Sequence, residues 1–447
     1  MSKFGRGLDQ VHASQGGALQ VHKRSPQLRR LRHVSLNISW KALPSDCATL
    51  DPIERRQWIV LLAIVSLLVG WNYWLDNFFF SSPFALFGGG FGDFEIYRLA
   101  GAAWLSHANP YVTSPPLLIY PPTSLPFFAL YASIPFHFAG QLWWFTYFFV
   151  FVVACIWLCL TLKGADRRLL FCTIVALLFF TSYPLLVLFQ LGQVDLLVEA
   201  LAVMGLALQR WKHGFLSAFM LSLSVLLKGP AVLLLVYFVL FRRDLAYLLH
   251  FLLSVLVVVG VSLLLVPVAD YWYYLIRVVP TFSGVISANS NQSLGGLVSM
   301  TYLHYLASAV SLGGFVLFTF FSYWAGGRRL RFSQELPFDA MFLMNVLIML
   351  LFGPRAIIYP YVWVILPLAL FLSALLMEHV RAGYLTLIGL GAFMLNSNLV
   401  PSILSYHVLP LELVGNLLTT LGLVILYARP SATATAPTNA HIPQTVT

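Results

Sequence analysis

Residues 142–162 read LWWFTYFFVFVVACIWLCLTL and contain no charged side chain. About 20 apolar residues suffice for a helix to cross the hydrocarbon core of a bilayer. Similar runs recur from Trp58 to Tyr427, and the whole chain is 60% hydrophobic and only 9% charged. A soluble domain has about 25% charged residues, so this chain cannot cover itself with polar surface. The sequence predicts an all-α polytopic membrane protein.

The apolar runs define a predicted membrane domain, residues 58–428, with about 11–12 transmembrane helices. Residues 1–57 form a basic tail that the positive-inside rule places in the cytoplasm. Residues 429–447, rich in Thr, Ala and Pro, are expected to be disordered. The expected spans are residues 58–76, 118–137, 142–162, 168–190, 194–210, 214–241, 245–267, 302–325, 338–352, 360–378, 383–400 and 410–428.

The basic loops conflict with a strict alternation of these spans. Alternation places Lys163, Arg167 and Arg168 outside, although the other basic clusters mark a shared inner face. The conflict disappears if residues 118–137 and 214–241 each cross an even number of times or not at all. Both are interrupted by proline, and broken helices survive in a bilayer only where protein or water satisfies the freed backbone groups. The outer loops are then residues 77–117, 190–194, 268–301, 353–359 and 401–409.

The longest of these outer loops carries an acidic pair, Asp93 and Glu95, directly after a run of glycines. Residues 96–107 follow with the pattern of an interfacial helix. The start of a helix favours ionised carboxylates, and an ionised carboxylate can act as a general base. Asp93 is therefore a candidate base and Glu95 a possible second acid. The alternative is that Asp93 only caps the helix.

Two further acids follow Gln193. Asp195 and Glu199 are four residues apart and share one helix face. Ionisable residues inside spans are expensive and usually face a cavity, which makes Asp195 another possible second acid. For Glu199 we expect a hydrogen-bonded acid that locks helices together.

Two cations are candidate phosphate ligands. Lys228 lies deep in an apolar run, where it must pair with an acid such as Asp195 or meet an anion. The alternative is that it snorkels to the interface. Arg355 stands on the predicted outer face against the charge bias and can bind a phosphate bidentately, either of a substrate or of an ordinary lipid.

A polar cluster at residues 289–296 contains Asn291 and Gln292, whose side chains suit sugar hydroxyls. Asn, Ser and Gly are also ordinary turn residues, so loop chemistry is the alternative. The sequence has no phosphate-binding loop, no dinucleotide fingerprint and no His-rich metal constellation. We therefore expect no cofactor and no metal. The basic tail is an ordinary topology signal, so we expect no nucleic-acid partner.

Several of these residues occur in the order of the landmarks of a known family, over roughly residues 58–380. Two positions depart from the pattern of that family. Asp195 stands where its members are expected to have an amide, and Lys228-Gly229-Pro230 stands where they are expected to have a Lys-Pro pair. The chain resembles glycosyltransferase family 87 in Asp93-Phe94 with Tyr97, Asn109-Pro110-Tyr111, Tyr120-Pro121-Pro122, Gly192-Gln193, Lys228 near Pro230 and Asn291-Gln292-Ser293-Leu294.

The resemblance implies a fold and a set of site residues. Members of this family are membrane mannosyltransferases of the superfamily C fold, with a long first extracytoplasmic loop that bears interfacial helices. By the same resemblance Asp93 matches the catalytic aspartate of that loop. The expected sugar- or acceptor-binding residues are Tyr97, Tyr111, Tyr120, Gln193, Asn291 and Gln292.

The expected function is the transfer of a hexose, mannose by this resemblance, from a polyprenyl-phosphate donor to a hydroxyl of a lipid- or glycan-linked acceptor. Asp93 would deprotonate the attacking hydroxyl with inversion at the sugar, and Lys228 or Arg355 would neutralise the phosphate. The expected partners are this donor, this acceptor and membrane lipids, in a bacterial plasma membrane in preference to the endoplasmic reticulum. The alternatives are a transporter or flippase of a lipid-linked saccharide and an inactive scaffolding subunit.

Overall fold

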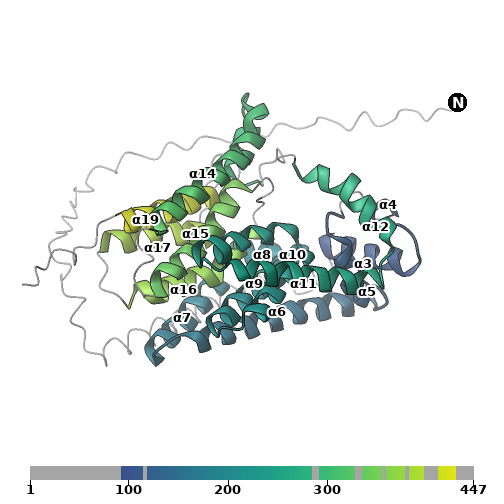
Figure 1. The fold of residues 1–447 in the computed structure, drawn as a ribbon, viewed down its shortest axis with the longest axis horizontal. Helices are drawn as coiled ribbons and strands as arrows, with labels where there is room; N and C mark the ends of the chain where they lie inside the picture. The colour runs from purple at the N-terminus through teal and green to yellow at the C-terminus, as the bar shows by residue number, and fades with distance from the viewer. Residues whose placement is uncertain are drawn as a thin grey trace, which may run out of the picture. The chain divides into compact units, whose positions relative to one another are not determined.

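The computed structural model of the chain describes residues 92–113, 118–283, 291–327, 335–353, 356, 359–377, 382–396 and 411–428. All of them belong to one compact unit, Leu50–Thr447. The predicted tails and the predicted span at residues 58–76 lie outside the described residues, so they stay predictions. Within the described ranges every regular element is a helix (Figure 1).

The helices differ widely in length, and many are broken into short pieces. In chain order they are α3 (Gly92–Leu105), α4 (Pro110–Thr113), η4 (Pro122–Ser124), α5 (Leu125–Ala132), α6 (Phe136–Thr161), α7 (Ala165–Thr181), α8 (Tyr183–Leu191), α9 (Asp195–Arg210), α10 (Gly214–Leu227), η5 (Gly229–Leu234), η6 (Tyr237–Phe241), α11 (Leu245–Leu263), α12 (Val268–Tyr273), η7 (Tyr274–Val278), η8 (Val279–Ser283), α13 (Leu294–Ser299), η9 (His304–Leu306), α14 (Ala307–Gly327), α15 (Glu335–Phe352), η10 (Tyr359–Val364), α16 (Ile365–Leu375), α17 (Ala382–Asn396) and α19 (Leu411–Ala428).

Among the described residues, three helical stretches are long and apolar enough to cross a membrane: Phe138–Leu160, Leu245–Leu263 and His304–Trp324. The bent pair α7 and α8 makes a fourth if it is one span, and several shorter apolar helices accompany them. On α6 the exposed large side chains recur every three or four residues, as on one lipid-facing side of a helix. They are Phe138, Leu142, Phe145, Phe149, Val152, Ile156 and Leu160, and Phe148 beside Phe149 is exposed as well. The described chain is that of an α-helical membrane protein.

The predicted span at residues 118–137 is wrong. Its prolines split it into η4 and α5, and α5 has only eight residues, about 12 Å of helix. That is too short to cross a bilayer, so this segment belongs to the alternative in which it does not cross. The predicted span at residues 168–190 is likewise two helices, bent by 59°. The break falls at Ser182, whose hydroxyl caps α8 ahead of Pro184.

The chain reverses direction within residues 214–241. The break at Gly229-Pro230 follows the end of α10. At that end Thr123 donates to the Leu226 carbonyl at 2.6 Å. The start and the end of the segment lie close together. Gln209, just before α10, donates its amide N–H to the carboxylate of Asp244, just after η6, at 3.0 Å. The prediction that this segment crosses an even number of times agrees with these contacts.

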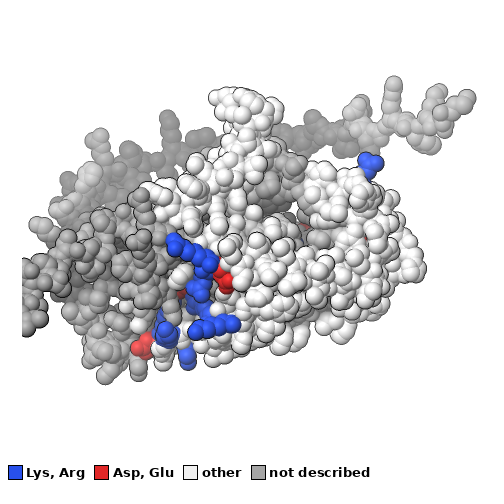
Figure 2. Space-filling view, viewed as in Figure 1, with Lys and Arg blue, Asp and Glu red and all other residues white. Residues whose placement is uncertain are grey.

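The basic residues of two predicted loops meet at one end of the bundle. Arg167 of α7 and Arg210 of α9 both bind the buried Asp339 of α15, the former at 2.8 Å. We call Arg167, Arg210 and Asp339 the arginine end. Figure 2 shows Lys and Arg gathered in one patch of an otherwise largely uncharged face. The shared carboxylate removes the conflict over Arg167, because it places the two basic loops on the same side.

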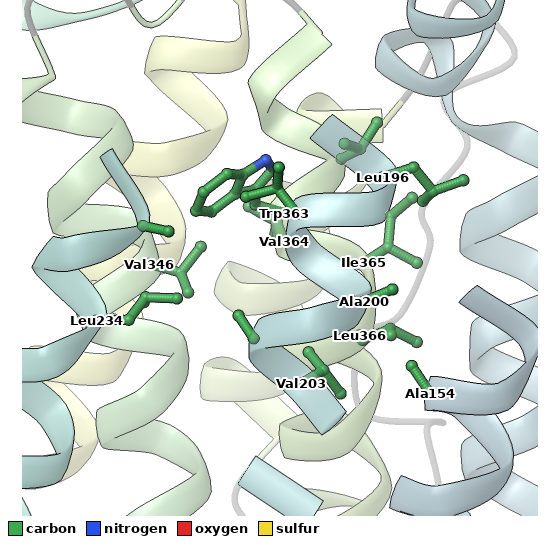
Figure 3. Close-up of a cluster of buried hydrophobic side chains, with 14 of the residues drawn as sticks. Ala154, Leu196, Ala200, Val203, Leu234, Val346, Trp363, Val364, Ile365 and Leu366 are labelled. Carbon is green, nitrogen blue, oxygen red and sulfur yellow. The ribbon is translucent and has the colours of Figure 1, made fainter. Parts of the chain in front are cut away.

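The core forms around α9, which is buried on nearly all sides. Thirteen of its sixteen residues are buried. In Figure 3, Leu196, Ala200 and Val203 of α9 lie beside Trp363 to Leu366 of η10 and α16. This central helix carries Asp195 in its first turn and Arg210 in its last, so it joins the arginine end to the opposite end, about 24 Å away.

Candidate active site

Helix α3, from the predicted first outer loop, is docked firmly on the bundle. It buries one face, made of Phe94, Tyr97, Ala100 and Gly101. A Cβ added to Gly101 would lie 2.7 Å from the Ala129 backbone nitrogen, so only glycine permits this close approach of α3 to α5. The docking fixes the position of Asp93 in the first turn of α3.

The side chain of Asp93 meets Gln193, which lies in the turn between α8 and α9. Gln193 Nε2 donates to Asp93 Oδ2. Gln193 Oε1 accepts from the hydroxyls of Tyr97 at 2.9 Å and Tyr120 at 3.0 Å. Those two hydroxyls are themselves 2.6 Å apart. The fold therefore brings together four predicted site residues from three separate segments.

An ion pair lies at the same end. Lys228 Nζ is 2.6 Å from Asp195 Oδ2, and both side chains are largely buried. The other oxygen of Asp195 accepts from Trp363 Nε1 at 3.0 Å. The prediction that Lys228 is held by an acid such as Asp195 is confirmed, and snorkelling is excluded for this conformation. The ammonium also lies 5.9 Å from the Tyr120 ring centroid, close enough for a cation–π interaction.

Burial raises the pKa of the Asp93 carboxyl to about 6; the Lys228 ammonium opposes this shift and the Asp195 carboxylate adds to it. Sequence reasoning expected the helix start to favour ionisation, but burial outweighs the dipole. At pH 7 such a group is still about 90% ionised. A base is most effective when its pKa lies near the working pH, so burial brings Asp93 into the useful range. Glu95 points to solvent.

Other predicted residues lie in structural contacts. The Tyr111 hydroxyl donates to the Tyr120 carbonyl at 2.9 Å, and its ring stacks on Tyr273. Asn291 Oδ1 accepts from the backbone and hydroxyl of Ser293, which in turn caps α13. These contacts join the first outer loop to α12 and order the start of α13.

The segment around Gln292 is tied to η10. Its backbone N–H donates to Ala356 at 2.8 Å, and Tyr361 donates to its carbonyl at 2.6 Å. Arg355 lies outside the described residues. Sequence reasoning missed Trp363, because its apolar surroundings hide it. The one signal was the indole N–H, which usually finds a partner when buried.

No group of three or more His, Cys, Asp or Glu side chains in the described ranges could hold a metal ion. Residues 118–354, just over half of the chain, match glycosyltransferase family 87. The chain belongs to this family. No curated protein matches it. As a member of family 87 it is a membrane glycosyltransferase.

The matched range of this family 87 glycosyltransferase contains Tyr120, Gln193, Asp195 and Lys228. Asp93 lies ahead of that range. The structure connects it to the family region through the Asp93–Gln193 hydrogen bond.

Proposed function

We propose that this glycosyltransferase moves a hexose, mannose by its family resemblance, from a polyprenyl phosphate to an acceptor hydroxyl, with inversion and with Asp93 as the general base. The observation that carries the proposal is Asp93 itself. It is a partly buried carboxylate with a pKa of about 6, held by Gln193, at the same end as the Lys228 cation. A base and a cation are the two groups that attack by a hydroxyl and departure of a phosphate require.

In the proposed reaction the acceptor oxygen bonds to the anomeric carbon as the bond from that carbon to the phosphate oxygen breaks. The hydroxyl proton passes to Asp93, and the electron pair of the broken bond stays on the departing polyprenyl phosphate. Lys228 stabilises that negative charge, and Arg355 is the second proposed phosphate ligand. Tyr120, Asn291 and Gln292 are proposed to contribute to sugar or acceptor binding.

We call the end of the bundle with Asp93, Gln193, Asp195 and Lys228 the site end. It is proposed to face the extracytoplasmic side. The support is indirect: the opposite, arginine end gathers the basic loops, and such loops favour the cytoplasm. The acceptor, carried by a lipid or a glycan, would then approach from outside.

The test is transfer of labelled mannose from a short-chain polyprenyl phosphate by purified protein in detergent. Asp93→Asn keeps the size of the side chain but cannot take up the proton. We expect kcat to fall about 10²- to 10⁴-fold, while donor binding and thermal stability stay close to those of the wild type. A flippase would give no transfer in detergent with either protein.

Glu95→Gln is the matched control, because Glu95 is the exposed acid of the same helix turn. It should keep full activity. Full activity of Asp93→Asn together with loss in Glu95→Gln would move the base by two residues. Full activity of both variants would overturn the assignment of the base to α3.

A further inference from the structure

The residue that holds Asp93 is itself held rigidly. Gly192, just before Gln193, has φ of +70° and caps α8, a conformation that favours glycine. Trp143 Nε1 donates to the Gly192 carbonyl at 2.9 Å, and the Gln193 N–H donates to the Leu188 carbonyl at 3.1 Å. The backbone at Gln193 is therefore fixed before any substrate binds.

The hydrogen bonds of the Gln193 side chain are almost used up. An amide has two N–H donors and one carbonyl oxygen with two lone pairs. The oxygen accepts from both Tyr97 and Tyr120, and one N–H goes to Asp93. Within the described residues only one N–H is left for a sugar, so Gln193 is poorly placed to recognise one.

The Asp93 carboxylate sets the direction of the amide, because an ionised carboxylate only accepts, whereas the tyrosine hydroxyls can donate or accept. If the amide were flipped, its carbonyl oxygen would face the Asp93 carboxylate, and two acceptors would repel. The observed direction instead aims an N–H at Asp93. A hydrogen bond donated to the charged form of an acid favours that form.

From these contacts we infer that Gln193 is the positioning residue of the catalytic base: it orients the Asp93 carboxylate, and the Tyr97 and Tyr120 hydroxyls hold the Gln193 amide in place. The inference rests on the proposed function, since it presumes that Asp93 is the base. It replaces the expectation that Gln193 binds the sugar or the acceptor.

The α3 docking separates this role from simple structural support. Phe94 and Tyr97 bury their rings against Trp143, with centroids 5.2 and 5.7 Å away, and Gly101 packs on α5. These ring and backbone contacts include no atom of Gln193, although the Tyr97 hydroxyl also donates to its side chain. Its removal therefore frees the Asp93 carboxylate and leaves the helix in place.

The decisive variant is Gln193→Met, which keeps an unbranched side chain of similar length without hydrogen bonds. We expect kcat to fall about 10- to 100-fold, the scale of a misplaced catalytic group, with the KM values for donor and acceptor unchanged. The acidic limb of the pH–rate profile should move to higher pH, because the bond that favours ionised Asp93 is lost. Tyr97→Phe should show a smaller loss of the same kind.

Gln209→Met is the matched control, because Gln209 also donates its amide to an aspartate, Asp244, at the other end of α9. Its kcat should be that of the wild type. In the Asp93→Asn background Gln193→Met should cause no further loss, since there is no base left to position.

Two results would overturn the inference while leaving the proposed function intact: a raised KM with unchanged kcat in Gln193→Met, or an equal further loss in the Asp93→Asn background. Failure of the proposed function would be seen separately, as an active Asp93→Asn single variant.

Discussion

Each end of α9 lies beside a buried aspartate in an ion pair, and the two aspartates meet different numbers of cations. Asp339 binds two arginines, Arg167 and Arg210, one at each carboxylate oxygen. Asp195 binds one cation, Lys228, and gives its other oxygen to the Trp363 indole. Asp339 is therefore paired with two cations, whereas Lys228 is paired with Asp195 and also acts through its charge on Asp93.

The difference distinguishes a structural ion-pair cluster, at Asp339, from a functional site, at Asp93 and Lys228. A buried carboxylate with charged partners on both oxygens has little left to offer a ligand, and its loss leaves uncompensated charges. At the site end, the Lys228 ammonium is paired with Asp195 and also acts through its charge on Asp93. Burial raises the pKa of Asp93, and the Lys228 charge does not cancel that shift; raised pKa values of this kind are common at functional sites.

The largest expected effect comes from removing the ion pairs of Asp339. Asp339→Asn leaves Arg167 and Arg210 without their shared anion. We expect unfolding to become easier by about 3 kcal/mol, the lower part of the range for broken buried pairs, since both arginines keep some contact with solvent. Thermal unfolding in detergent measures this change, and the remaining folded protein should keep its specific activity.

Asp244→Asn is the control for that variant, because Asp244 only caps α11 and accepts from Gln209. It should cost less than about 1 kcal/mol, because Asn caps a helix about as well as Asp. Loss of activity at unchanged stability in Asp339→Asn would contradict a purely structural role of Asp339.

The second prediction concerns Lys228, the cation that is paired with Asp195. Its charge lowers the pKa of Asp93, so Lys228→Met raises that pKa. A base with a higher pKa stays protonated up to a higher pH. The acidic limb of the pH–rate profile, near pH 6 in the wild type, should therefore move upward, and donor binding should weaken about 10-fold or more.

Asp195→Asn tests the sign of that argument. Asp195 raises the pKa of Asp93, so its neutralisation should move the acidic limb downward. A shift in the same direction for both variants, or no shift in either, would show that Lys228 and Asp195 do not act on Asp93 through charge.

The structure brings together Asp93, Gln193, Asp195 and Lys228, which the sequence had singled out as candidates. Asp195 and Lys228 were noticed because charged groups are rare in an apolar chain and must find partners, whereas Asp93 was noticed at a helix start after a glycine run and Gln193 through the family resemblance. Their partners could not be predicted, because contacts between Asp93 and Gln193 depend on how α3 docks. The pairing of Lys228 with Asp195 was the exception, since a buried lysine needs an acid nearby.

The helix boundaries failed where proline and glycine compete with an apolar pattern. Residues 118–137 are apolar enough for a span, but backbone constraints divide them into η4 and α5. The shared binding of Arg167 and Arg210 to Asp339 was also beyond the sequence, because Asp339 lies in a span far along the chain and nothing local marks its partners.

The smallest expected effect concerns Glu199, another buried acid of the bundle. Glu199 Oε1 accepts from the Leu366 N–H at 3.1 Å, at the start of α16, and its Oε2 has no hydrogen bond among the described residues. Glu199→Gln keeps the acceptor for Leu366 and changes only the group with no partner. We expect a change in unfolding free energy below about 1 kcal/mol and unchanged kcat. Glu199→Leu, which leaves the Leu366 N–H unpaired, should cost about 1–3 kcal/mol. If Glu199→Gln instead lost activity while staying folded, a negative charge at Glu199 would be needed one turn below Asp195. The site end would then contain three working acids, and the contrast with the arginine end would be wider still.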